Sequence, residues 1–331
     1  MTDTFAPTSL GDTEPRRNSS TPGPRRSDHV HRGTRSRRVR SRPLLRARGT
    51  RPTYFSWLLA LLCLSPVSSF AQQRPLVTED PETIGAGRML VEAGFDYTRD
   101  VEYPVSGLRG HLRRFPLIGV SLGIGPIGEV QIDGGLYNHL SITERQPAPL
   151  AFMLDRSGDT TSDVEDVVIG TKVRLVSEGA SRPSIALRSA TRLPMASNEG
   201  GLGLDTMDFY SSLLIAKTTR SVRVVGNVGL GILGDPTRGD RQNDVLTYGL
   251  SFARALTQRA EVVGEINGHI STREGDPPPG TDSRSILRLG GRYTTGPIRA
   301  DAGLLIGVLS GDPGWGVTTG FTYVFNAFQL P

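Results

Sequence analysis

The stretch Trp315-Gly-Val-Thr-Thr-Gly-Phe-Thr-Tyr-Val-Phe325 has two different faces when it is read as a β-strand. Side chains alternate between the two faces of a strand with a period of two. One face is apolar and aromatic, with Trp315, Val317, Thr319, Phe321, Tyr323 and Phe325. The other face is small and mostly polar, with Gly316, Thr318, Gly320, Thr322 and Val324. This pattern is typical of an outer-membrane β-barrel, which turns apolar side chains to lipid and polar ones to the lumen.

The same two-faced pattern recurs upstream, and short and long connections alternate between the segments that carry it. We therefore predict twelve strands at residues 89–97, 115–124, 129–140, 166–175, 184–193, 207–216, 222–232, 246–252, 261–269, 287–293, 299–308 and 315–325. The predicted fold class is all-β, a 12-stranded antiparallel up-and-down transmembrane β-barrel, because single-chain bacterial barrels have an even number of strands. The expected location is the outer membrane of a Gram-negative-type bacterium, with short turns in the periplasm and long loops outside.

The basic character of the chain is confined to its N-terminal part. The whole chain has a formal net charge of +5, but residues 1–71 hold 13 arginines against 4 acidic residues. The rest holds 25 basic residues against 29 acidic ones, so the predicted folded part is mildly acidic and no nucleic-acid partner is expected. Cys63 is the only cysteine, which excludes an intrachain disulfide and a thiolate metal cluster.

Composition divides the chain into five predicted parts. Residues 1–50 are rich in Arg, Pro, Ser and Thr, which predicts either a disordered extension or a stretch upstream of the true start. Residues 51–71 have a positive start, an apolar core and a small-x-small end, as a secretory signal peptide does. Residues 72–87 are expected to lie in the periplasm or in the lumen, residues 88–325 to form the barrel, and residues 326–331 to form a C-terminal tail.

A soluble all-β protein would also show alternating strands. In the predicted strands, however, the charged residues share the face opposite to the apolar side chains. Placing Arg or Lys at the lipid midplane costs about 2–4 kcal/mol, so this segregation is expected of a membrane barrel. Aromatic residues at strand ends, including Tyr97, Phe115, Tyr293 and Phe325, favour the same interpretation.

The predicted lumen contains nearly equal numbers of acidic and basic side chains, which favours ion pairs between neighbouring strands over a strongly ion-selective field. These charges either fill and solvate the interior or form a narrow pore with a solute site. The candidate solute site, for an anionic or aromatic ligand, comprises Lys172, Arg174, Arg188, Arg192, Asp133, Glu265, Arg288 and Arg292.

The end of the last strand resembles the C-terminal recognition signal of outer-membrane proteins, through Thr318, Gly320, Tyr323 and Phe325. The chain also resembles the outer-membrane transporter family named for the meta-pathway of phenol degradation, between about Arg74 and Phe325. The matching stretches are Arg74-Pro-Leu-Val-Thr-Glu-Asp80, Val173-Arg-Leu-Val176, Arg182-Pro-Ser-Ile-Ala-Leu-Arg188, Leu193-Pro194, Glu265-Ile-Asn-Gly268 and Gly314-Trp-Gly316 onward. The resemblance implies a barrel with a transport role and identifies no solute.

The sequence therefore predicts a channel or transporter for small, hydrophobic or aromatic solutes, without a cofactor or metal. Its expected partners are outer-membrane lipid, the barrel-assembly machinery and the solute. One alternative is a structural or adhesive barrel without transport. The other is a lipid hydrolase with a Ser and a His on the outer face; His139 and His269 are predicted to face the lumen, which counts against it.

Overall fold

The computed structural model describes residues 74–155 and 158–328; the predicted extension and signal peptide lie outside these ranges. The strands are β1 (Arg88–Tyr103), β2 (Leu108–Ile124), β3 (Gly128–Gly135), β4 (Asn138–Arg145), β5 (Thr160–Asp163), β6 (Val167–Val176), β7 (Ser184–Leu193), β8 (Asp208–Thr219), β9 (Val222–Gly234), β10 (Gln242–Ala255), β11 (Ala260–Ser271), β12 (Arg284–Thr295), β13 (Ile298–Gly307) and β14 (Trp315–Asn326). A short 3₁₀ helix, η1 (Ala151–Met153), lies between β4 and β5. No helix in the described ranges is both long and apolar enough to span a bilayer.

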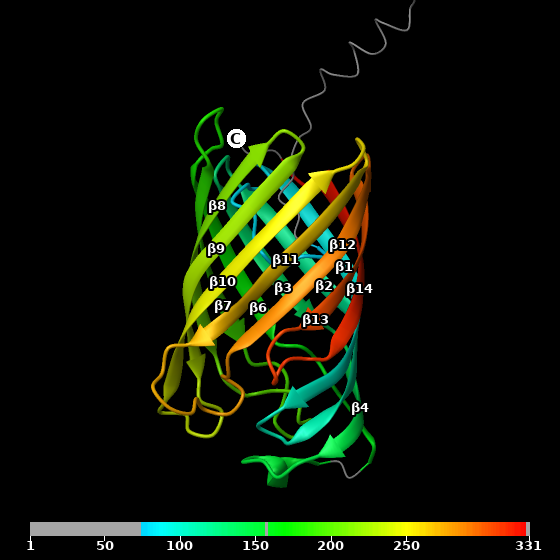
Figure 1. Cartoon of the computed structure of the whole chain (residues 1–331), viewed down its shortest axis with the longest axis vertical. Coiled ribbons are helices and arrows are strands. Elements are labelled where there is room, and N and C mark those ends of the chain that lie inside the picture. The colour runs from blue at the N-terminus through cyan, green and yellow to red at the C-terminus, as the bar shows by residue number, and fades with distance from the viewer. Residues whose placement is uncertain (1–73, 156–157, 329–331) are drawn as a thin grey trace, which may run out of the picture. The chain divides into compact units, whose positions relative to one another are not determined.

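The strands close into a single antiparallel barrel (Figure 1). From β6 to β14 each strand pairs with the next along the chain, β1 pairs with β2, and β1 closes the ring by pairing with β14, with Met89 opposite Phe325. Two barrel strands are interrupted: β3 and β4 both pair with β2, while β6 pairs with β3 and β5 with β4. Counting β3–β4 and β5–β6 as one strand each gives twelve, so the predicted fold class and strand number are confirmed.

The connections alternate between the two ends of the barrel. Those at 125–127, 177–183, 220–221, 256–259 and 296–297 share the end where β1 begins and β14 finishes, which we call the short-turn end. Those at 104–107, 146–159, 194–207, 235–241, 272–283 and 308–314 lie at the other end, the loop end, and most of them are longer. At this loop end β2 pairs with β4, with Leu108 opposite Arg145, and β4 lies at the lower end of the barrel in the view of Figure 1.

The predicted strand 129–140 is wrong in one respect, because the structure breaks it after Gly135. Opposite the break, β2 contains Pro116, which has no N–H to donate to a ladder. The Phe115 N–H instead donates to the Tyr137 carbonyl (2.9 Å), and the Leu136 N–H donates to the Pro116 carbonyl (3.1 Å). This irregularity reverses the alternation of side chains between lipid and lumen. The side chains of β4 that were predicted to face the lumen therefore face outward, and those predicted to face outward face the lumen.

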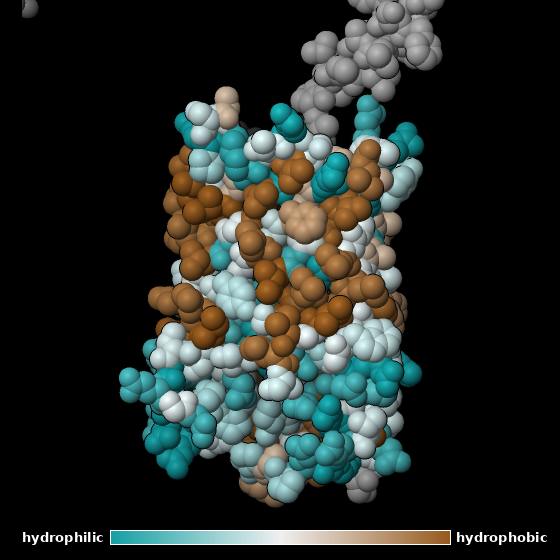
Figure 2. Space-filling model, in the orientation of Figure 1, coloured by the Kyte–Doolittle hydropathy of each residue, from teal (hydrophilic) through white to brown (hydrophobic). Residues whose placement is uncertain are grey.

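The distribution of side chains is the reverse of that in a soluble protein. Apolar residues on the outer face are highly exposed, for example Leu230 (63 %) and Leu250 (56 %), while Lys172 and Asp208 on the inner face are only 1 % exposed. On the face seen in Figure 2 the apolar residues form a band across the middle of the barrel, with polar residues towards the two ends. An apolar belt around a polar interior is what a bilayer requires, since lipid cannot solvate charged groups.

Candidate functional site

The interior of the barrel is occupied by residues 74–87, which we call the N-terminal segment. It precedes β1 and contacts inward-facing side chains from strands around the ring, including β1, β6, β9, β11 and β14. Most of these contacts are ion pairs or hydrogen bonds, and they join the segment to the wall over its whole length.

The most buried contact involves Lys172 of β6. Its ammonium lies 3.2 Å from Glu79 and 3.3 Å from Glu129, and its side chain is 1 % exposed. In the ladder Lys172 stands directly opposite Arg188 of β7, and like charges in this position repel. Glu79 of the N-terminal segment offsets the repulsion, because it also lies 2.9 Å from Arg188. The carboxylate that balances these two cations therefore comes from outside the sheet.

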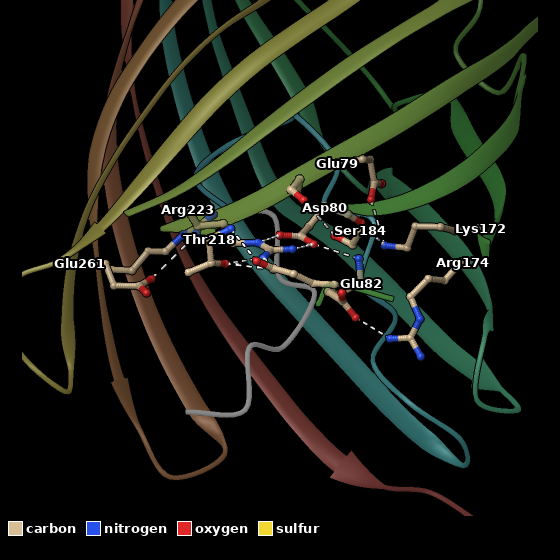
Figure 3. Close-up of polar contacts among 12 residues, drawn as sticks. Glu79, Asp80, Glu82, Lys172, Arg174, Ser184, Thr218, Arg223 and Glu261 are labelled. Atoms are coloured by element: carbon tan, nitrogen blue, oxygen red, sulfur yellow. Dashed lines mark hydrogen bonds and ion pairs between the residues drawn. The ribbon is translucent and has the colours of Figure 1, made fainter. Parts of the chain in front are cut away.

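Two further carboxylates of the segment are paired with wall arginines (Figure 3). Asp80 accepts two hydrogen bonds from Arg223 of β9, from Nε at 2.5 Å and from Nη2 at 2.7 Å. Glu82 is paired with Arg174 of β6. The pair of Asp80 and Arg223 is fork-like, with two hydrogen bonds side by side, and such a pair is stronger than neutral hydrogen bonds and holds the partners in one orientation.

Wall carboxylates bind the backbone of the segment as well. Glu265 of β11 accepts the N–H groups of Val77 (2.8 Å) and Thr78 (2.7 Å), and it is itself held by Arg288 of β12 at 3.0 Å. Glu129 of β3 accepts the N–H of Ile84 at 2.8 Å. These backbone N–H groups do not pair with a neighbouring strand. The carboxylate oxygens accept their hydrogen bonds instead, as the carbonyl groups of a strand would in a sheet.

Arg74 anchors the beginning of the described segment against β1 and β14. Its Nη2 donates to Thr318 Oγ1 (2.9 Å) and to the Thr319 carbonyl (3.0 Å), and it lies 3.4 Å from Asp96. A Cβ atom at Gly94 or at Gly320 would lie 2.3 Å from the Arg74 side chain. Glycine at both positions thus leaves room for the guanidinium.

A cavity of about 480 Å³ lies between the N-terminal segment and a wall formed mainly by β1, β2, β3, β6, β7 and β8. Of the eight residues predicted as a solute site, Asp133, Arg188, Arg192 and Arg288 line it. Lys172, Arg174, Glu265 and Arg292 also lie on the inner side but are bound to the segment; Arg292 Nε donates to the Arg74 carbonyl at 2.8 Å. The predicted set is thus divided between the cavity and the contacts with the segment, and Arg188 belongs to both groups because it also lies 2.9 Å from Glu79.

Sequence reasoning missed Arg114, which also lines the cavity and binds Asp96 (2.7 Å) and Glu165 (2.9 Å). It lies in the part of β2 that the sequence analysis assigned to a loop. The sequence analysis also gave no role to Glu79, Asp80 and Glu82. Their signal was present, since this acidic run precedes two neighbouring strands, 166–175 and 184–193, that carry four inward bases between them, Lys172, Arg174, Arg188 and Arg192.

Pairs between neighbouring strands, as predicted, account for other lumen charges. Arg192 stands opposite Asp208 and lies 2.5 Å from it, and Arg288 stands opposite Glu265. In the turn 177–183, Glu178 receives hydrogen bonds from Lys217, the Thr218 N–H and Arg223. Burial raises the pKa of Glu178, but these hydrogen bonds outweigh it and lower the pKa from 4.5 to about 2.

The four residues of the predicted insertion signal divide between the two faces of β14. Thr318 and Gly320 face inward against Arg74. Tyr323 and Phe325 face outward and stack on each other with ring centroids 5.3 Å apart. The assembly role of these residues remains a prediction.

The prediction that His139 faces the lumen is wrong, because the break after Gly135 reverses the phase of β4. Its neighbour Leu140 is fully buried in an inward cluster with Leu108 and Leu112, so His139 projects outward. There its Nδ1 lies 2.8 Å from Ser162 Oγ of β5, and Tyr137 OH lies 3.2 Å from the same hydroxyl. His269 does face inward, with Nε2 2.8 Å from the Asp282 carbonyl.

The stretch Gly119-Val-Ser-Leu-Gly123 has the Gly-x-Ser-x-Gly spacing of a nucleophile elbow. It lies in the middle of β2, however, and its serine is buried on the inner face. An elbow requires a sharp turn from a strand to a helix, so this stretch is a strand and not a nucleophile site. In the part of the chain that the structure describes, no cluster of three or more His, Cys, Asp or Glu could hold a metal.

Fold and lumen together define a transmembrane β-barrel of the outer-membrane type. The chain is similar to the crystal structure of the COG4313 outer membrane channel from Pseudomonas putida F1, with a TM-score of 0.53 and 12 % identity over 74 % of this chain and 98 % of that one. The NanC porin matches with a TM-score of 0.43 and 11 % identity, over 73 % of this chain and 100 % of that one. No protein-family model matches the chain, and no curated protein matches it in sequence. At this identity the likeness to the first structure establishes the fold.

Proposed function

We propose that this protein is an outer-membrane channel for small solutes, and that the N-terminal segment closes it reversibly. The observation that carries the proposal is the pairing of Glu79, Asp80 and Glu82 with Lys172, Arg188, Arg223 and Arg174. Ion pairs are exchangeable: once the segment leaves, water and a solute replace it at the same cations. A segment fixed by an apolar core would have no such replacement.

The freed bases define the chemistry of the solute path. Lys172, Arg174 and Arg188 on β6 and β7, joined by Arg223 on β9, would form a basic strip where the segment carboxylates now lie. Such a strip suits small anionic or aromatic solutes, since guanidinium groups bind carboxylates and stack on aromatic faces. Passage of such solutes by facilitated diffusion agrees with the role implied by the resemblance to the meta-pathway family, and it needs no cofactor.

Planar-bilayer conductance of the refolded protein tests the proposal. The intact protein should conduct rarely, while a variant that lacks residues 74–87 should conduct steadily. Glu79→Gln combined with Asp80→Asn should give intermediate open times. Glu274→Gln is the matched control, because this acid is exposed in the loop 272–283 and takes part in no ion pair within the described residues. If the deletion variant leaves the bilayer as sealed as the intact protein does, the barrel is structural or adhesive and the channel proposal fails.

A second candidate function has one observation in its favour, the outward pair of Ser162 and His139. With Nδ1 unprotonated and Tyr137 OH donating to Ser162 Oγ, His139 accepts a hydrogen bond from the Ser162 hydroxyl and would be the base that activates this hydroxyl against a lipid ester. Ser162→Ala and His139→Ala should each abolish ester hydrolysis in mixed micelles if this activity exists. Equal hydrolysis by both variants and by the intact protein would exclude it, whatever the conductance shows.

A further inference from the structure

Beyond the channel, the outer wall carries a positively charged surface at the loop end of the barrel. It consists of Arg99 on β1, Arg109, His111 and Arg113 on β2, and His139 on β4, and we call it the outer basic face. The ladder places these residues side by side, with Arg113 opposite both Tyr97 and His139. They project outward, because their neighbours Thr98, Leu112 and Leu140 are buried on the inner side.

A row of aromatic side chains borders this face on the side of the apolar belt. Trp315 lies 6.1 Å from Tyr97 and Phe115 lies 6.4 Å from Phe95, measured between ring centroids. Phe115 and Tyr137 are about half exposed. Aromatic girdles mark the level of the lipid headgroups, so the outer basic face lies at the headgroups of the outer leaflet.

The charges of this face are only partly balanced. Arg109 lies 3.2 Å from Glu102 and 3.8 Å from Glu144. Arg99 lies over the ring of Trp315, 5.8 Å from its centroid, and its buried Nε has no hydrogen-bond partner. Across residues 74–155 and 158–328 neither Arg99 nor the exposed Arg113 forms an ion pair. A guanidinium without a carboxylate partner beside an aromatic row has donors left for an anion of the membrane.

We propose that the outer basic face binds the phosphate groups of the phosphorylated glycolipid of the outer leaflet. Guanidinium groups recognise phosphate oxygens through paired, charge-assisted hydrogen bonds. Arg99 and Arg113 supply these donors, and His111 and His139 lie beside them. Tyr137 and Ser162 extend the face with hydroxyl groups suited to the sugar. The acyl chains of the same lipid would then lie against the aromatic row and the belt below it.

The test measures binding of purified lipid A to the full mature chain in detergent, by native mass spectrometry. Replacing both Arg99 and Arg113 with Gln removes two charged contacts and should weaken binding roughly tenfold to a hundredfold. Arg254→Gln is the matched control, because this exposed arginine lies on the outer face of β10 at the opposite, short-turn end. The control should bind as the intact protein does, and all variants should keep the same heat-induced unfolding.

Three comparison ligands decide the chemistry. Dephosphorylated lipid A should bind as weakly to the intact protein as lipid A binds to the double variant. Phosphatidylglycerol and inorganic phosphate should bind more weakly than lipid A. The proposal is overturned if the double variant retains full affinity, if removal of the phosphates changes nothing, or if phosphatidylglycerol binds equally well.

Discussion

Replacing Lys172 with Met should release the N-terminal segment from the lumen. The side chain is 1 % exposed and lies between Glu79 and Glu129, so its removal leaves two buried carboxylates with less positive charge. Removing one partner of a buried ion pair costs about 3–5 kcal/mol, because the other partner stays desolvated. This cost falls mainly on the closed state: when the segment leaves, Glu79 goes with it into water and Glu129 becomes hydrated.

The equilibrium between closed and open should therefore shift by at most about 3–5 kcal/mol, or roughly two to three and a half powers of ten. Arg188 and Gln131 still hold Glu79, so the measured shift should lie at the lower end. Alkylation of a cysteine at position 83, introduced by Thr83→Cys in a Cys63→Ser background, reports on release. Thr83 is 8 % exposed, and its accessibility should rise when the segment leaves.

A partner substitution separates release from general damage. Glu129→Gln in addition to Lys172→Met removes one of the two carboxylates that have lost their lysine partner. This double variant should restore part of the protection of the cysteine at position 83 against alkylation, since residues in contact are energetically coupled. Lys172→Arg keeps the charge and should alkylate nearly as slowly as the parent. If Lys172→Met alkylates at the parental rate while its barrel remains folded, Lys172 does not hold the segment and the reasoning is refuted.

Three further outcomes follow from the described contacts. Gly94→Ala places a Cβ 2.3 Å from the Arg74 guanidinium and should displace that side chain. The displacement should be seen as faster proteolysis near Arg74 with an unchanged barrel. Gly291→Ala is the control, because its Cβ would meet only one atom, at 3.5 Å. Leu250→Arg puts a charge on the lipid face near the middle of β10 and should lower the free energy of unfolding by about 2–4 kcal/mol. Leu256→Arg, in the short turn 256–259, should lower it by only about 0–1 kcal/mol. Equal losses would contradict the assignment of the apolar outer face to lipid. The pKa of Glu178 falls from 4.5 to about 2 on folding, so the stabilisation of the folded protein by this carboxylate is complete above about pH 4.5 and is lost as the pH drops through about 2. Glu178→Gln should therefore flatten the pH dependence of the unfolding temperature between these two values. An unchanged profile would count against these contacts.

The strand pattern was readable from the sequence because it depends on local alternation. Each side chain within a strand must face either lipid or lumen, so residues such as Leu250 and Lys172 reveal their side by their chemistry. The predicted bounds 184–193 agree with β7, and the odd positions of β14 from Trp315 to Phe325 face outward as expected. Twelve strands and their pairing order follow from the same alternation and from the connection lengths.

The arrangement inside the barrel was decided by tertiary structure. The alternation places Lys172 and Arg188 in the lumen, but it contains no information on which carboxylate neutralises them, and Glu79 lies 93 residues before Lys172. The phase of β4 depends on Pro116 in a different strand, so the outward position of His139 was also beyond local reasoning. Within uninterrupted strands, sequence alone thus determined which residues turn away from lipid, because that choice is made residue by residue. Only the closed barrel decided which of them meet, because ion pairs and ladder breaks depend on chains brought together from distant positions.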